Sequence, residues 1–203
     1  MILLVCALPA ELRFFTPPAN VKIFACGVGP VEAAIAVARE LGSAPYSTVI
    51  NAGIGGIYRD VARVGDARLV TADALADFGL EGGGVLALPE GTLVEHASAN
   101  AALVMQLAGI APHATGVTVA AVTTTDATGE RLRARYGHDV ETMESFSVLR
   151  AAEIAGVPAI GVRGISNYIG NRAASEWDFA AGARATAATL DLLFARLATR
   201  KDR

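Results

Sequence analysis

The chain has 203 residues, of which 53% are hydrophobic and 18% are charged, and its formal net charge is −3. A membrane helix needs about 20 consecutive apolar residues, whereas Glu, Arg or Asp interrupts every apolar run of this sequence. Acids and bases are interspersed, which leaves no basic stripe that could bind a nucleic acid. A signal peptide carries basic residues ahead of its apolar run, and none precede the first apolar run of this sequence. We therefore expect one cytoplasmic domain, residues 1–203, whose partner is a small molecule.

Cysteine and histidine are too scattered for a metal centre. Cys6 and Cys26 lie in short apolar runs, where a free cysteine behaves as a small hydrophobic residue. His96, His113 and His138 have no Cys or His close to them in sequence, so the spacing of a zinc site is missing. We expect no metal, no cofactor and no disulfide, and three histidines at the surface.

Apolar runs of strand length alternate with Ala-rich segments of helical period, which is typical of an α/β fold with a sheet covered by helices. The predicted strands span residues 2–7, 21–26, 48–52, 67–72, 115–122 and 158–165, with shorter pieces near Val85 and Val140. The predicted helices span residues 30–41, 99–108, 130–136, 144–155 and 178–200. No repeat or linker divides this series.

Glycines follow two of the predicted strands, at the edge of the sheet where α/β folds bind ligands. The segment G-V-G-P at residues 27–30 leads into a helix, but Ala33 stands where a dinucleotide fingerprint needs its third glycine, so a plain turn remains the alternative. The segment N-A-G-I-G-G at residues 51–56 lets a backbone approach a bound group and lacks the Lys and Ser/Thr of a P-loop. It indicates a pocket.

Two acids lie where catalytic groups tend to collect. Glu11 follows the first strand in A-L-P-A-E, and Glu144 begins a helical pattern in E-T-M-E. For both, the alternative is a solvated acid in the first turn of a helix, and Met143 would then belong to the core.

The last predicted strand carries a charge. Arg163 lies inside the apolar run, and Ser166 and Asn167 end it. A buried guanidinium needs a partner, such as a carboxylate at the mouth of a pocket, unless this is an edge strand and Arg163 faces water. The hydroxyl-rich loop at residues 123–128, which includes Thr125, either binds a ligand or bonds its own backbone.

These segments, taken in this order, resemble the landmarks of the nucleoside phosphorylase and nucleosidase superfamily over nearly the whole chain. The later half, with V-T-T-T-D-A-T-G-E-R, R-G-I-S-N-Y-I-G-N-R and S-E-W-D-F, resembles the futalosine hydrolase family still more. The resemblance implies a single-domain three-layer sandwich, in which helices flank a central mixed β-sheet. It also implies a homodimer or higher homo-oligomer.

The resemblance also implies roles for individual residues. Glu11 matches the acid that activates the attacking water, and Asn167 matches the residue that contacts the purine. The positions matched to substrate binding are Gly53, Ile54, Gly55, Met143, Glu144, Arg163, Ser166 and Thr125. Met143 and Glu144 match a pair that packs under the ribose and bonds it. The turn at residues 53–56 is one residue shorter than the nucleosidase pattern.

Asn167 bears on the choice of base. Nucleosidases specific for adenine resemble this chain but carry Asp there, whereas an amide can donate to a 6-oxo group and accept from a protonated N7, which suits hypoxanthine. The resemblance thus predicts hydrolysis of the N-glycosidic bond of futalosine, with release of hypoxanthine and dehypoxanthine futalosine, in menaquinone biosynthesis.

Other functions remain open. One is a methylthioadenosine/S-adenosylhomocysteine-type nucleosidase, and another is a binding module without turnover. A purine nucleoside phosphorylase needs cations around its phosphate, whereas the first loop offers Glu11, with Arg13 the only base nearby. Futalosine also carries an aromatic carboxylate, and Arg59, Thr125 and Arg172 are the candidates to hold it.

Overall fold

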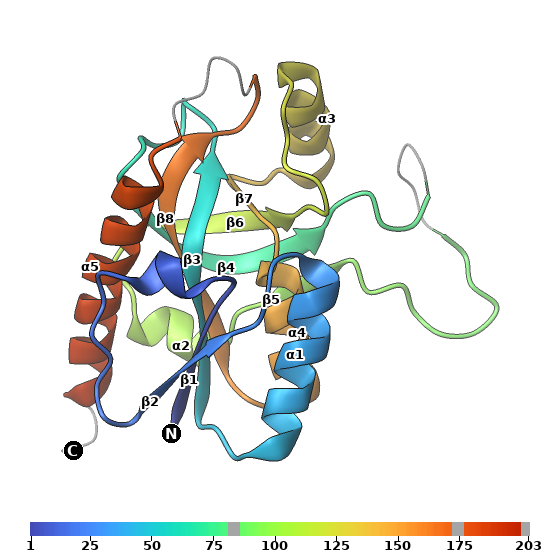
Figure 1. Ribbon diagram of the computed structural model, residues 1–203. Helices are drawn as coiled ribbons and strands as arrows, with labels where there is room; N and C mark the ends of the chain where they lie inside the picture. The colour runs from blue at the N-terminus through green and yellow to red at the C-terminus, as the bar shows by residue number, and fades with distance from the viewer. Residues whose placement is uncertain (81–85, 172–176, 200–203) are drawn as a thin grey trace.

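The computed structural model describes residues 1–80, 86–171 and 177–199 and has one mixed β-sheet (Figure 1). Its eight strands are β1 (Ile2–Cys6), β2 (Val21–Ala25), β3 (Thr48–Ile57), β4 (Ala67–Leu75), β5 (His96–Ser98), β6 (His113–Thr118), β7 (Val140–Thr142) and β8 (Ala159–Tyr168). The strand order is β2-β1-β3-β7-β6-β4-β5, and β8 pairs with both β3 and β4. As a result β3, β8, β4, β6 and β7 pair in a closed circuit.

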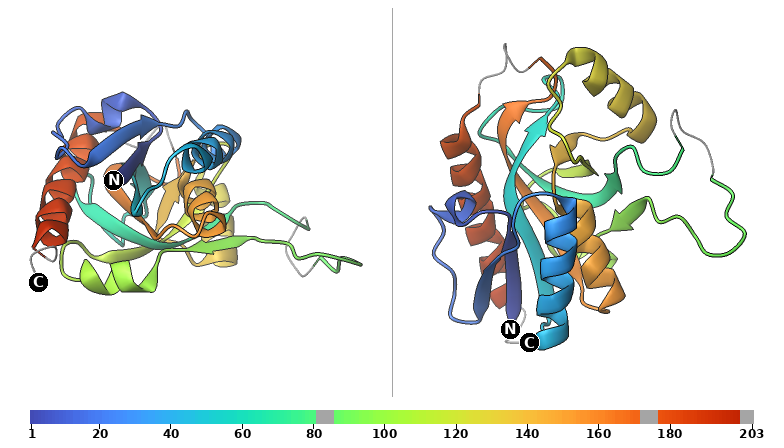
Figure 2. Two further views of the ribbon diagram at one scale, coloured as in Figure 1. Left: turned by 90° about the horizontal axis from the view of Figure 1, so that it is seen from below. Right: turned by 45° about the vertical axis from the view of Figure 1, so that its right-hand side comes forward.

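Helices cover both faces of this sheet. The helices are α1 (Pro30–Ser43), α2 (Ala101–Gln106), α3 (Asp126–Tyr136), α4 (Ser145–Ile154) and α5 (Phe179–Ala198), with a 3-10 helix, η1 (Pro9–Leu12). Figure 2 shows α5 along one side of the strands and α1 with α4 along the other. This confirms the predicted three-layer α/β fold. Within the described ranges, no helix has the length and hydropathy that a membrane span requires.

The core has one part on each side of the sheet. β1 is buried on both faces, so that Leu4 packs toward α5 with Leu190, while Leu3 packs toward α1 with Val37. Complete burial of each such side chain contributes about 1.5–3 kcal/mol. Helix α5 approaches the sheet closely because glycines meet there: a Cβ on Gly164 would lie 1.9 Å from a backbone oxygen of α5.

Two strands are longer than predicted. β3 continues through Ile57 and β8 through Tyr168, because the glycines after Ala52 keep their parallel pairing with β8. The predicted glycine turn at residues 53–56 is therefore wrong, since these residues are strand. β7 confirms the short piece near Val140, β5 was not predicted, and Val85 lies outside the described residues.

One histidine prediction is also wrong. His96 and His113 are exposed as predicted, but only 1% of His138 is exposed. Its Nε2 lies 3.0 Å from the hydroxyl of Tyr58, which donates a hydrogen bond to the carbonyl of Gly129 in α3. Burial lowers the pKa of His138 to about 4. This histidine helps to fix α3 on the sheet.

Candidate active site

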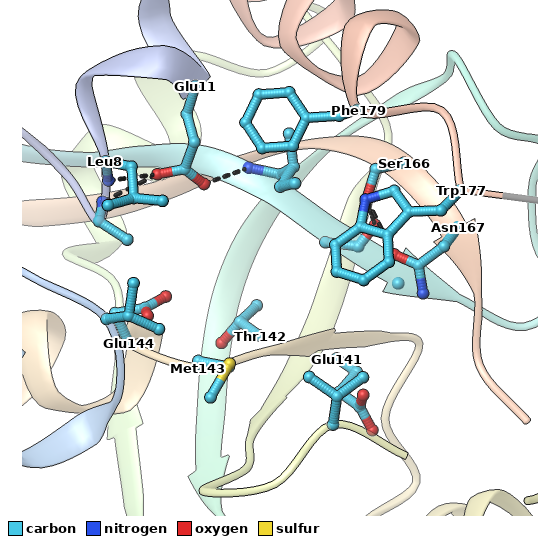
Figure 3. Close-up of a pocket in the computed structure, with 16 residues that line it drawn as sticks. Leu8, Glu11, Glu141, Thr142, Met143, Glu144, Ser166, Asn167, Trp177 and Phe179 are labelled. Atoms are coloured by element: carbon cyan, nitrogen blue, oxygen red, sulfur yellow. Dashed lines mark hydrogen bonds between the residues drawn. The ribbon is translucent and has the colours of Figure 1, made fainter. Parts of the chain in front are cut away.

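A pocket of about 200 Å³ lies at the carboxyl ends of β1, β3 and β8 (Figure 3). Parallel strands that end together open such crevices in α/β folds. The residues that line it are Ala7, Leu8, Glu11, Val28, Ile54, Gly55, Gly56, Val122, Glu141, Thr142, Met143, Glu144, Ser166, Asn167, Trp177 and Phe179. Seven of the ten predicted site residues are in this set, namely Glu11, Ile54, Gly55, Met143, Glu144, Ser166 and Asn167.

Backbone amides hold the Glu11 carboxylate. Oε2 accepts hydrogen bonds of 2.9 Å from the N–H groups of Ala7 and Leu8, and Oε1 accepts one of 3.0 Å from Ile54. Glu11 is 6% exposed, so the alternative of a solvated acid does not hold. A carboxylate offers about four lone-pair sites, and these bonds occupy three. One acceptor site on Oε1 is left for a ligand.

Gly53 does not line the pocket, but it leaves room for this carboxylate. A Cβ added to Gly53 would lie 2.5 Å from Glu11 Oε1. Gly56 serves Asn167 in the same way, because a Cβ there would lie 2.9 Å from the amide nitrogen of Asn167. The glycines of β3 therefore make space for two pocket side chains instead of forming a turn.

Glu144 stands opposite Glu11, at the N-cap position of α4. Its Oε1 accepts a 2.8 Å hydrogen bond from the backbone N–H of Gly29, so the G-V-G-P segment contributes to the site through its backbone. Burial raises the pKa of Glu144, and the bond from Gly29 opposes this shift. Met143 lies beside it on the pocket wall.

Asn167 lies at the other end of the pocket (Figure 3). Its Oδ1 accepts a 2.8 Å hydrogen bond from Ser166 Oγ, and its Nδ2 donates to the carbonyl of Tyr168 at 3.3 Å. A side-chain amide has two N–H donors and two acceptor sites. One donor and one acceptor of Asn167 are therefore left for a ligand.

Arg163 is not a pocket residue, and neither of the two predictions about its surroundings is correct. It is 2% exposed, on a strand that is paired on both sides, so it neither faces water nor forms an ion pair among the described residues. Its guanidinium donates to the carbonyls of Asn51 and Val162 at 2.8 Å, to the Asn51 side chain, and to Ser145 Oγ at 2.9 Å. It ties β3 and β8 to the start of α4, which carries Glu144.

Thr125 also lies outside the pocket lining. Its hydroxyl accepts from the backbone N–H of Thr128 at 3.2 Å and caps α3, which was the alternative considered for this loop. The other candidates for the carboxylate end are not in the lining either. Arg59 stacks on the Tyr168 ring at 4.0 Å, and Arg172 lies outside the described residues.

Sequence reasoning missed several lining residues, above all Glu141, Thr142, Trp177 and Phe179. Glu141 accepts from the backbone N–H of Thr123 at 3.0 Å and from its hydroxyl, and burial raises its pKa. The signal for Glu141 was the first acid of E-T-M-E, and that for the two aromatic residues was S-E-W-D-F. Nothing local distinguished them from core or surface residues.

Comparison with known proteins identifies the family of this chain. The family model of the phosphorylase superfamily matches residues 8–199. A futalosine hydrolase of Streptomyces coelicolor is 37% identical over 180 residues, which cover 79% of this chain and 72% of that protein. The chain belongs to the futalosine hydrolase family of the phosphorylase superfamily. A futalosine hydrolase of Thermus thermophilus is 32% identical over 159 residues, and the match covers 74% of this chain and 71% of that protein.

Several solved structures share the fold of this chain. A futalosine hydrolase of Helicobacter pylori matches with a TM-score of 0.81 and 14% identity, covering 96% of this chain and 97% of the other. A 5′-methylthioadenosine/S-adenosylhomocysteine nucleosidase of Neisseria meningitidis, in complex with methylthio-immucillin-A, matches with a TM-score of 0.80 and 14% identity over 95% and 97% of the two chains. The three-layer architecture is therefore common to both activities.

Proposed function

We propose that this chain hydrolyses the N-glycosidic bond of futalosine and releases hypoxanthine and dehypoxanthine futalosine, as a step of menaquinone biosynthesis. Membership of the futalosine hydrolase family supports this substrate. The observation that carries the choice of base is Asn167, whose amide keeps one donor and one acceptor free at one end of the pocket. The 6-oxo group of hypoxanthine accepts, and its protonated N7 donates, so the two patterns are complementary.

The ribose then lies between Asn167 and the two acids. Glu144 faces the middle of the pocket beside Met143, and its carboxylate accepts from ribose hydroxyls while Met143 packs under the ring. The acceptor site left on Glu11 Oε1 receives a hydrogen bond from the attacking water. The three backbone bonds to Glu11 fix its direction, as a general base requires.

In the reaction, the bond between C1′ and the purine nitrogen breaks and its electron pair leaves with the base. The sugar passes through an oxocarbenium-like state, which the carboxylate of Glu144 stabilises by its charge. Water forms the new bond to C1′ and gives one proton to Glu11, which releases it to solvent after the reaction, while the departing base takes up one proton from solvent. Asn167 stabilises the leaving purine by donating a hydrogen bond to the 6-oxo group and accepting one from the protonated N7.

A phosphorylase is the less suitable alternative for this pocket. Phosphate transfer requires cations that converge on the anion, whereas the residues lining the pocket in the described part of the chain include no Lys, Arg or His. An adenine-directed nucleosidase has the same fold, and both the identity with futalosine hydrolases and the donor and acceptor pattern at Asn167 argue against it.

The decisive experiment is product analysis after incubation with futalosine, inosine and methylthioadenosine, each with and without phosphate. We expect rapid release of hypoxanthine from futalosine at a rate that phosphate does not change. Adenine release from methylthioadenosine at a higher rate would contradict the assignment of the base. Dependence on phosphate would make the chain a phosphorylase, and no cleavage of any substrate would leave it a binding module.

We further propose a homodimer in the cytoplasm. Leu8 and Val28 line the pocket but are 45% and 48% exposed, and Val31 and Ile35 follow on the exposed face of α1 at 66% and 62%. A second copy that covered these side chains would also close the pocket. Analytical ultracentrifugation tests the dimer, and a monomer at all concentrations would exclude it.

The cytoplasm is proposed because both cysteines are free, as is usual in a reducing compartment.

A further inference from the structure

The proposed substrate poses an electrostatic problem. Glu11, Glu141 and Glu144 all line the pocket, and no basic side chain lines it within the described residues. Futalosine carries an aryl carboxylate at the end of its C5′ substituent. The carboxylates of the pocket repel this anion, and the net charge of −3 adds to the repulsion. Cations close to the pocket would therefore favour binding of this substrate.

Two arginines stand at such a position. Arg13 is the C-cap of η1, directly after the element that carries Glu11, and its guanidinium carbon lies 4.6 Å from the Phe14 ring centroid. The same carbon lies 5.9 Å from the ring of Phe179, which lines the pocket. The guanidinium carbon of Arg184, from α5, lies 4.0 Å from the Phe14 ring. The Phe14 ring thus gathers two cations beside a wall of the pocket.

Within residues 1–80, 86–171 and 177–199, no acid forms an ion pair with either of these charges. Arg13 and Arg184 are exposed, and the ion pairs among the described residues all involve other cations. Arg131 and Arg133, in contrast, each bind an aspartate through two hydrogen bonds. A free guanidinium presents the planar pair of donors that a carboxylate fits.

We propose that Arg13 and Arg184, held by Phe14, form a subsite for the carboxylate of an aryl carboxylate substituent at C5′ of the nucleoside. The subsite rests on the proposed function. With the ribose between Asn167 and the two acids, the substituent leaves the pocket along Phe179, on which its aromatic ring packs. The carboxylate then meets the two guanidinium groups, away from the acids.

The kinetic test compares futalosine with inosine, which has the same base and ribose but no acid at C5′. For R13Q and R184Q we expect kcat/KM with futalosine to fall about tenfold each, mainly through KM, because each change removes a charge-assisted hydrogen bond. Inosine kinetics should not change. The matched control is R196Q, at an exposed arginine near the C-terminal end of α5, which should change the kinetics of neither substrate. An equal loss on both nucleosides, or no loss, would overturn the subsite.

A binding test decides the question independently of turnover. Trp177 is the single tryptophan of the chain and lines the pocket, so its fluorescence reports on ligands there. We expect benzoate to bind more tightly than the neutral benzamide, and the difference to vanish in the R13Q/R184Q double variant and at high salt. If the wild type cleaves no nucleoside but shows this difference, the proposed function fails and the subsite stands. Equal binding of benzoate by wild type and double variant rejects the subsite.

Discussion

The acids of the pocket and the polar groups buried behind it are held in different ways. Glu11, Glu144 and Glu141 each accept at least one hydrogen bond from a backbone N–H. Asp73, inside the sheet, accepts a 2.7 Å hydrogen bond from the Thr118 hydroxyl on Oδ1, and its Oδ2 has no hydrogen-bond partner among the described residues. His138 likewise has one partner, Tyr58, and an unpartnered Nδ1.

This difference predicts that the pocket acids serve activity, whereas the buried groups behind the pocket affect the stability of the fold. Backbone donors are fixed by the fold, so they aim the pocket carboxylates at a ligand. The interior groups each keep one polar atom without a hydrogen-bond partner among the described residues, and burial raises the pKa of Asp73 to about 7 and lowers that of His138 to about 4. Burial therefore favours the neutral form of both. Changes in the pocket should alter activity, whereas changes behind it should alter stability and its dependence on pH.

The largest effect is expected for E11Q. Glutamine keeps the size of the side chain but cannot take a proton from water, so kcat should fall about 10³-fold while the substrate still binds. Steady-state kinetics and a titration of Trp177 fluorescence measure the two quantities. E153Q, at an exposed acid of α4, is the matched control. Near-full activity of E11Q would remove Glu11 from the role of base.

G53A should come next. The new Cβ would lie 2.5 Å from Glu11 Oε1 and push the carboxylate off the Ile54 amide. A displacement of this size lowers kcat by about 10²-fold, and the fold should survive because the flexible end of a side chain moves. G42A, in α1 where nothing lies within 4 Å of the added Cβ, is the control. If G53A retains the wild-type kcat, the orientation of the Glu11 carboxylate does not limit the rate of the reaction.

N167D tests the other end of the pocket. It replaces the amide of Asn167 with a carboxylate, whose hydrogen-bond partner there is the Ser166 hydroxyl and not a backbone N–H. Aspartate accepts from a 6-amino group, so the ratio of kcat/KM for inosine over adenosine should fall about 30-fold. N100D changes an N-cap where Asn and Asp are equivalent, and it should leave the ratio unchanged. An unaltered ratio in N167D would show that this amide does not choose the base.

H138Q should affect stability alone. Because the pKa of His138 falls from 6.5 to about 4 on folding, the unfolded chain takes up a proton first as the pH drops. The folded state then loses at most about 3 kcal/mol between neutral pH and pH 4. Asp73, whose pKa rises on folding, has the opposite effect, so the comparison with wild type isolates His138.

In denaturant titrations at several pH values, H138Q should lose less stability on acidification than the wild type, with kcat unchanged at neutral pH. Parallel loss in both proteins would mean that His138 is protonated in the folded state over this range.

The sequence by itself determined the elements and the acids at their ends. In the part of the chain that the structure describes, the apolar runs predict six of the eight strands and all five α-helices to within a few residues, and a seventh strand is indicated near Val140. Strand and helix periods are local properties of the chain, so a sequence can show them. Glu11 after the first strand and Glu144 before a helix were found in the same way. The resemblance of six motifs added the role of Asn167.

Only the tertiary structure decided which distant groups meet. The register of β3 on β8 places Gly56 beside Asn167, and the approach of η1 to β3 places Glu11 against Gly53. The partners of Arg163 and the burial of His138 likewise depend on contacts between segments far apart in sequence. Local patterns carry no record of such pairings, because strand pairing and packing fix them only when the whole sheet has formed.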